Sequence, residues 1–175
     1  MNTIVLGGGC FWCTEAIFKS LKGVKSVVPG YAGGTLKNPS YQDLHDQDTG
    51  HAEVIQIEFD EKIIPLHDLL DVFFHTHNPC TLNRQGADVG SEYRSIILYS
   101  DDKQKKIAED LIKELQGSGE FKSPIVTEVS PLDMFYEAED YHKDYYAKNK
   151  GMPYCDLVIS PKLAHLRELY SDKLK

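Results

Sequence analysis

Two cysteines lie three residues apart near the N-terminus of this chain, with Phe11 and Trp12 between them. An apolar run at residues 3–6 and three glycines precede Cys10, and apolar residues at helical spacing follow it, which predicts a strand, a tight turn and a helix. The unpaired amides and the dipole of a helix N-terminus favour negative charge. We therefore predict that Cys10 has a lowered thiol pKa and reacts as a thiolate. The glycines should let another molecule approach closely.

The spacing of Cys10 and Cys13 is that of a C-x-x-C pair, which is typical of thiol–disulfide chemistry or of half a zinc site. A zinc site needs two more ligands and no second C-x-x-C occurs, so we expect no metal. A thioredoxin-like exchanger, with Cys10 attacking and Cys13 resolving, is an alternative. The bulky aromatic pair between the cysteines argues against it. Cys80 and Cys155 complete the set of cysteines.

A carboxyl group marks the start of a clear strand over residues 53–59. Positions 55, 57 and 59 are apolar, so one face of the strand is buried, and Glu53 shares that parity. A buried carboxylate is costly unless it is protonated or hydrogen-bonded. Glu53 is therefore either a structural residue or a carboxyl with a raised pKa, as a general acid near neutral pH requires. Parity alone leaves both open.

The 175-residue length predicts one domain over residues 1–175. A net charge of −8 argues against nucleic acid or an anionic membrane as a partner. No apolar run reaches the roughly 18 residues of a membrane span, and the first residues do not resemble a signal peptide. We expect a cytoplasmic protein with reduced cysteines, in which a disulfide would be catalytic.

The remaining pattern alternates strands with helices, which predicts an α+β sandwich with helices packed on one sheet. Further strands are expected over residues 24–28, 94–99 and 125–129, and helices after Pro65, after Asp101, over 138–149 and from Ser160. Residues 29–34 are expected to form a turn, 35–51 an irregular segment, and 78–93 a long loop.

Several segments resemble peptide methionine sulfoxide reductase A, in the same order, between about residues 4 and 162. The most specific are Gly-Cys-Phe-Trp at residues 9–12 and Gly-His-Ala-Glu at residues 50–53. The other matching segments are Glu15, residues 28–34, 38–41, 82–86 with Asp88, 90–95 and 138–145. On these motifs the chain is identified as a member of that family.

The resemblance implies a single-domain α/β sandwich with a ferredoxin-like mixed sheet and long irregular loops, without metal or organic cofactor. It implies a peptide-methionine (S)-S-oxide reductase, an oxidoreductase that repairs the S epimer of methionine sulfoxide, free or in oxidised proteins. The implied roles are a nucleophile at Cys10, a proton-donating carboxyl at Glu53, hydrogen-bonding phenols at Tyr41 and Tyr93, a methyl pocket at Phe11 and Trp12, and a polar wall at Asp88.

The family's cycle implies that Cys10 becomes a sulfenic acid, which a second thiol converts to a disulfide. Thioredoxin is the implied reductant, and we expect a monomer. The glycine-rich tail of many members is missing around Cys155, so we place Cys13 ahead of Cys155 as the resolving thiol, with Cys80 third. A cycle with only one cysteine, or a general thiol–disulfide oxidoreductase, is the alternative.

Overall fold

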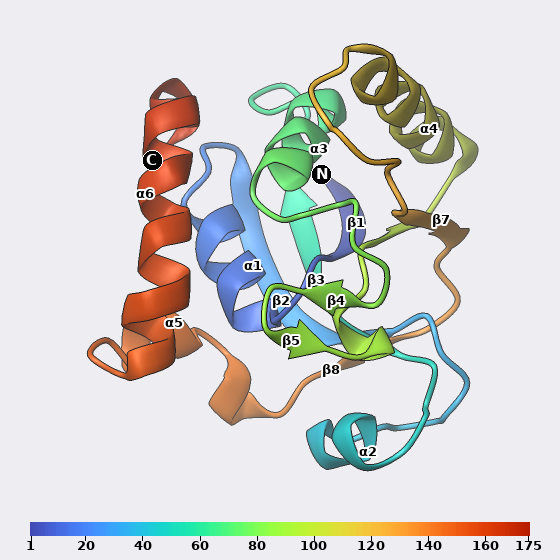
Figure 1. Ribbon diagram of the computed structural model, residues 1–175, viewed down its shortest axis with the longest axis vertical. Helices are drawn as coiled ribbons and strands as arrows, with labels where there is room; N and C mark the ends of the chain where they lie inside the picture. Colours follow the sequence, from blue (N-terminus) through green and yellow to red (C-terminus); the bar gives the residue numbers. More distant parts are fainter.

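A computed structural model describes residues 1–175 and shows a six-stranded sheet with helices packed against one face (Figure 1). The strands lie in the order β7-β6-β1-β3-β2-β8, and only the β6–β7 pair is parallel. They are β1 (Asn2–Gly7), β2 (Val24–Ala32), β3 (Ala52–Phe59), β6 (Ile96–Tyr99), β7 (Glu128–Pro131) and β8 (Phe135–Glu137). A separate short hairpin is formed by β4 (Arg84–Gln85) and β5 (Asp88–Val89). The predicted α+β class is confirmed.

The helices are α1 (Phe11–Lys19), α2 (Tyr41–Asp46), α3 (Leu66–His75), α4 (Asp102–Gly117), α5 (Tyr145–Lys148) and α6 (Ser160–Tyr170). Short 3-10 turns cover Ser91–Tyr93, Asp140–His142 and Ser171–Lys173, and a π-helical segment covers Cys155–Ile159. No helix has the length and apolar character needed to cross a lipid bilayer.

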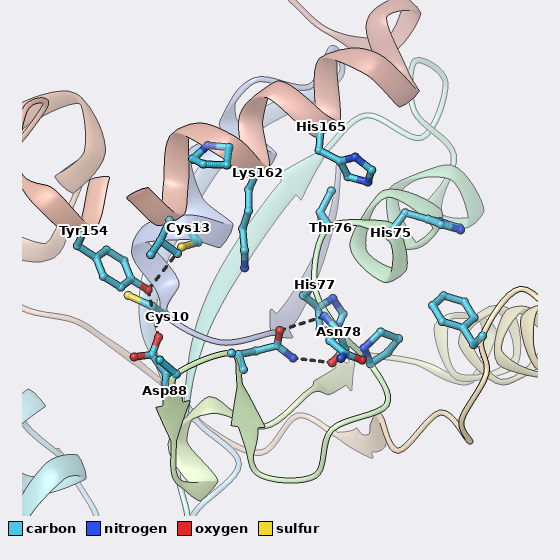
Figure 2. Close-up of a pocket in the computed structure, with 17 residues that line it drawn as sticks. Cys10, Cys13, His75, Thr76, His77, Asn78, Asp88, Tyr154, Lys162 and His165 are labelled. Atoms are coloured by element: carbon cyan, nitrogen blue, oxygen red, sulfur yellow. Dashed lines mark hydrogen bonds between the residues drawn. The ribbon is translucent and has the colours of Figure 1, made fainter. Parts of the chain in front are cut away.

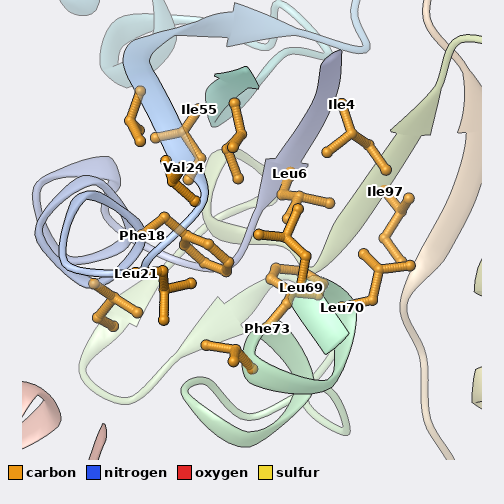
Figure 3. Packing of buried hydrophobic residues seen from close by; sticks show 14 of the residues in the cluster. Ile4, Leu6, Phe18, Leu21, Val24, Ile55, Leu69, Leu70, Phe73 and Ile97 are labelled. Carbon is orange, nitrogen blue, oxygen red and sulfur yellow. The ribbon is translucent and has the colours of Figure 1, made fainter. Parts of the chain in front are cut away.

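Alternation along the central strands explains why the helices lie on one face. Ile55 and Ile57 of β3 belong to the main core, together with Phe18 of α1 and Phe73 of α3. Figure 3 shows side chains of the sheet and of both helices in this core. Val54, of the opposite parity, belongs to a smaller cluster on the other face. The helices therefore rest on the face to which Glu53 also belongs, as its parity predicts.

Strand β2 is longer than the sequence predicts, because it continues through Pro29 to Ala32. Proline has no N–H to donate to a neighbouring strand. Pro29 lies at the end of the pairing with β8, where only its carbonyl is needed, and this carbonyl accepts the amide of Ala138. The predicted irregular segment that follows contains α2, which begins with a capping box between Ser40 and Asp43.

The C-terminal third also departs from the prediction. The expected helix over 138–149 is only a 3-10 turn and the short α5, because Asp144 has a left-handed backbone and its amide donates to Glu15 of α1. Helical structure instead runs without a break from Pro153 to Tyr170. Within that run α6 begins at Ser160 with Pro161 in its first turn, as predicted, but the π-helical segment leads into it without a break.

Phe73 provides a test of the core. Its side chain is fully buried between α3 and the sheet, so Phe73→Ala should lower the free energy of unfolding by about 3–5 kcal/mol. Urea titration measures this change, and Ile63→Ala, at an exposed position, should change it by less than about 0.5 kcal/mol. Equal effects of the two substitutions would contradict the packing described here.

Candidate active site

Cys10 is the N-cap residue of α1, as the sequence predicts, and its carbonyl accepts the amides of Cys13 and Thr14. Gly9 before it has a φ of 91°, a conformation that favours glycine. A Cβ at Gly9 would lie 2.8 Å from the side chain of Gln85. The expectation that the glycines leave room for another molecule is therefore wrong at Gly9, because Gln85 fills that space.

The predicted lowering of the Cys10 pKa is also wrong for this state of the protein. Burial of the thiol raises its pKa well above the usual value, and the charges of Glu53 and Cys13 raise it further. The amide of Trp12 favours the thiolate but is outweighed. The first free amide of α1, that of Phe11, donates to Glu53 Oε1 at 3.2 Å. Cys10 is therefore a neutral thiol at rest.

Glu53 is almost completely buried at the start of β3, with 1% of its surface exposed. Burial raises its pKa to about 8, against the effect of the Phe11 amide, and the carboxyls of Glu92 and Asp88 raise it further. Its Oε1 accepts the Phe11 amide, while its Oε2 is buried without a hydrogen-bond partner. At neutral pH the group is mainly a carboxylic acid, with its proton on Oε2.

Two half-buried phenols share this environment. Tyr41 opens α2 and Tyr93 ends the 3-10 turn before β6. Burial raises the pKa of both, and the nearby charges of Glu53, Asp88 and Cys10 raise it further. Both therefore keep their protons at neutral pH and remain hydrogen-bond donors. The structure brings these five predicted site residues into one electrostatic neighbourhood.

The aromatic pair after Cys10 forms one wall of the site. The Phe11 ring is fully buried, with its centroid 5.7 Å from that of Tyr31 and 6.4 Å from that of Tyr41. Trp12 stacks on Tyr145 at 3.7 Å, and its Nε1–H donates to His142 Nδ1 at 3.0 Å. Both aromatic rings are held by contacts on more than one side, which gives the wall a fixed shape.

A cavity of about 700 Å³ borders the two cysteines, between α6, the end of α3 and the β4–β5 hairpin (Figure 2). The Tyr154 hydroxyl lies 3.7 Å from Cys13 Sγ and donates to Asp88 Oδ2 at 3.1 Å. Lys162 extends from α6 into this space. The cavity is not lined by Glu53, so it meets the carboxyl and phenol cluster only through Cys10 and Asp88.

All four cysteines are free thiols, and three of them lie together. Cys13 and Cys155 are both buried in one small cluster, against which Cys10 packs. Cys80 lies outside it, and its thiol donates to the carbonyl of Ser123. No group of three His, Cys, Asp or Glu side chains is arranged to hold a metal ion.

Sequence reasoning missed several residues that shape the site. Glu139 accepts the Tyr31 hydroxyl and the Tyr41 amide, and His142 orients Trp12. Both residues belong to the 138–145 segment. The match of this segment to the family is the sequence feature that could have identified them. His45, which packs edge-on against Tyr41, carried no such signal.

Three other histidines, His51, His75 and His77, have structural contacts. His51 accepts the amide of Gly34 and also contacts the carbonyl of Leu36. Burial lowers the pKa of His77 to about 3, and its ring is held by Phe73 and Ser95. His75 contacts Glu120.

The geometry defines a redox site in which the partly buried thiol of Cys10 lies beside a neutral carboxylic acid. The family model described as peptide methionine sulfoxide reductase matches residues 2–174. Peptide methionine sulfoxide reductase MsrA from Saccharolobus solfataricus is 55% identical over 175 residues, covering 100% of this chain and 98% of that protein. The chain therefore belongs to the peptide methionine sulfoxide reductase family. It is an oxidoreductase of the peptide-methionine (S)-S-oxide reductase class.

Solved structures agree with this assignment. Mxr1 from Saccharomyces cerevisiae in reduced form has a TM-score of 0.82 and 35% identity, with 88% of each chain covered. Mxr1 in complex with Trx2 has a TM-score of 0.58 and 27% identity, covering 82% of this chain and 84% of that one.

The buried acid should make stability depend on pH. Folded protein holds the Glu53 proton up to about pH 8, whereas the unfolded chain releases it near 4.5. The folded state thus binds more protons in that window, so the free energy of unfolding falls as pH rises through it. Glu53→Gln should reduce this fall, as measured by urea titration at several pH values. Glu58→Gln, on the other face of β3, is the matched control, and an unchanged slope in Glu53→Gln would show that Glu53 is not a buried acid.

Proposed function

We propose that this protein reduces methionine-S-sulfoxide, free and in oxidised proteins, through a sulfenic acid at Cys10. The observation that supports this most directly is the neutral Glu53 carboxyl beside the Cys10 thiol. A sulfoxide sulfur becomes electrophilic when its oxygen is protonated or strongly hydrogen-bonded, and a carboxylic acid that keeps its proton at neutral pH supplies that.

In this proposal the sulfoxide oxygen lies among Glu53 Oε2 and the hydroxyls of Tyr41 and Tyr93. The phenols stabilise the charge that develops on oxygen, in the manner of an oxyanion hole. Phe11 and Trp12 take the methyl group in an apolar pocket, and Asp88 forms the polar wall. The S epimer is preferred because oxygen and methyl must face opposite walls.

The chemical step balances as thiol plus sulfoxide giving sulfenic acid plus thioether. The Cys10 sulfur attacks the substrate sulfur and loses its proton, while Glu53 gives its proton to the sulfoxide oxygen. The oxygen is transferred to Cys10 and methionine leaves. Since burial raises the Cys10 pKa, loss of the thiol proton occurs only as the sulfur–sulfur contact forms.

Cys13 is the proposed resolving thiol, with Cys155 second and Cys80 third. Cys13 lies on the first turn of the helix that Cys10 caps, so a local unwinding is enough to join them. Condensation forms the disulfide and releases water. Cys155 packs against Cys13, which keeps it available. Direct reduction of the sulfenic acid by an external thiol, a cycle with one cysteine, is the remaining alternative.

The proposed reductant is thioredoxin, whose dithiol would regain the two thiols of this enzyme as it becomes a disulfide. The relative Mxr1 forms a complex with Trx2, which supports this choice. We also propose that the chain acts as one catalytic domain over residues 1–175, as a monomeric cytoplasmic repair enzyme without a nucleic-acid or membrane partner.

A general thiol–disulfide oxidoreductase is the second candidate, because Cys10 and Cys13 share the first turn of α1. Thiol–disulfide exchange needs neither a protonated carboxyl nor phenols, so this candidate function leaves Glu53, Tyr41 and Tyr93 without a role. Disulfide exchange should therefore survive Glu53→Gln, whereas sulfoxide reduction should not.

Glu53→Gln should lower the single-turnover rate of methionine formation about 10²–10⁴-fold, because an amide cannot deliver the proton. Rapid quench of the reduced enzyme with each epimer measures it. Disulfide exchange with a small disulfide in the same variant is the internal control. A variant with unchanged sulfoxide reduction would exclude Glu53 as the proton donor.

The oxidised enzyme from one turnover should lose two thiols and contain a Cys10–Cys13 linkage, as mapped by peptide mass spectrometry. Cys13→Ser should then lose one thiol per turnover or shift the linkage to Cys155, while Cys80→Ser should match the unsubstituted protein. A Cys10–Cys155 linkage in the unsubstituted protein would instead assign the resolving role to Cys155.

A further inference from the structure

His45 lies between two carboxyl groups of the site. Its Nε2 is 3.7 Å from Glu53 Oε2, and its Nδ1 is 3.8 Å from Glu92 Oε2. The side chains of Glu53, His45 and Glu92 are 1%, 28% and 13% exposed, so His45 and Glu92 both reach solvent whereas Glu53 does not. The ring also packs edge-on against Tyr41, with the centroids 4.3 Å apart.

We propose that His45 is a proton-relay residue that connects Glu53 Oε2 with solvent by way of Glu92. This inference rests on the proposed function, in which Glu53 loses a proton at every turnover. It assigns a role to α2 beyond carrying Tyr41.

The buried acid needs such a path. Glu53 Oε1 is occupied by the amide of Phe11, while Oε2 carries the proton and has no hydrogen-bond partner. Burial of the carboxyl removes it from bulk water, so its proton cannot be replaced directly. An imidazole accepts a proton at one ring nitrogen and gives one at the other, and its two nitrogens here face the two carboxyls.

The relay step transfers protons only, without electrons. After the Oε2–H bond breaks and the sulfoxide oxygen takes the proton, Nε2–H gives its proton to Oε2. Nδ1 then takes a proton from water by way of Glu92, and exchange of the ring protons with solvent returns His45 to the form that carries its proton on Nε2. The Cys10 thiol releases one proton to solvent in each turnover, so the cycle has no net uptake. A small rotation of the ring brings Nε2 from 3.7 Å to hydrogen-bond distance of Oε2.

The groups that face His45 come from four elements. They are Glu53 of β3, Glu92 and Tyr93 of the 3-10 turn, Tyr41 of α2 itself, and His142, whose pKa a charge on His45 lowers. Both phenols stay protonated, and burial lowers the pKa of His142, so His142 adds no competing positive charge near neutral pH. The two carboxyls are the groups that exchange protons with the ring.

A pH-jump measurement tests the relay. Reduced enzyme is held at about pH 9.5, where Glu53 is ionised, and mixed with methionine-S-sulfoxide in buffer at about pH 6.5. The first-turnover rate is divided by that of the same protein kept at pH 6.5 throughout. This ratio should be near 1 in the unsubstituted protein and should fall about fivefold or more in His45→Gln. Added imidazole should restore it, which a purely structural role of His45 would not allow.

Two further variants complete the design. Glu92→Gln should lower the ratio in the same direction, which keeps the test valid if His45→Gln does not fold. His67→Gln, at an exposed histidine that pairs with Asp68 and Glu114, should leave it near 1. A ratio near 1 in both His45→Gln and Glu92→Gln would overturn the relay and leave the proposed reaction intact. Full sulfoxide reductase activity of Glu53→Gln would instead contradict the assignment of Glu53 as the proton donor of the proposed reaction.

Discussion

The contact between Glu53 and the first amide of α1 is the constraint on which the site depends. It joins the start of β3 to the N-terminus of the helix that carries Cys10, so the acid and the thiol cannot move independently. The amide that would otherwise stabilise a thiolate is used by the carboxyl group. The helix terminus thereby holds a neutral acid in place, and the resting thiol keeps its proton.

This arrangement suits chemistry in which charge develops only in the transition state. A thiolate and an ionised Glu53 side by side would repel each other in a buried site. With both groups neutral, the site has little charge until a sulfoxide polarises it, and the phenols of Tyr41 and Tyr93 are already donors. Burial, which costs stability when the acid ionises, is therefore also what keeps Glu53 protonated near neutral pH.

The C-terminal segment shapes the surface around the thiols. It forms a continuous helix from Pro153 to Tyr170, and Tyr154 ties this helix to Asp88 beside Cys13. The π-helical turn holds Cys155 in the same buried cluster as Cys13. Two further thiols thus lie close to Cys10 without a long flexible segment, although the helix must loosen for Cys155 itself to react.

The sequence by itself determined the central strands, the helix after Cys10, the burial of Glu53 and the family, because periodicity and motif spacing are local properties of the chain. It placed the turn after Val28 and the helix over 138–149 wrongly, because these depend on partners distant in sequence: β8 beside Pro29, and Glu15 bonded to Asp144. Only the tertiary structure decided the protonation of Cys10 and the place of His45, since burial and the charges of neighbouring elements set both.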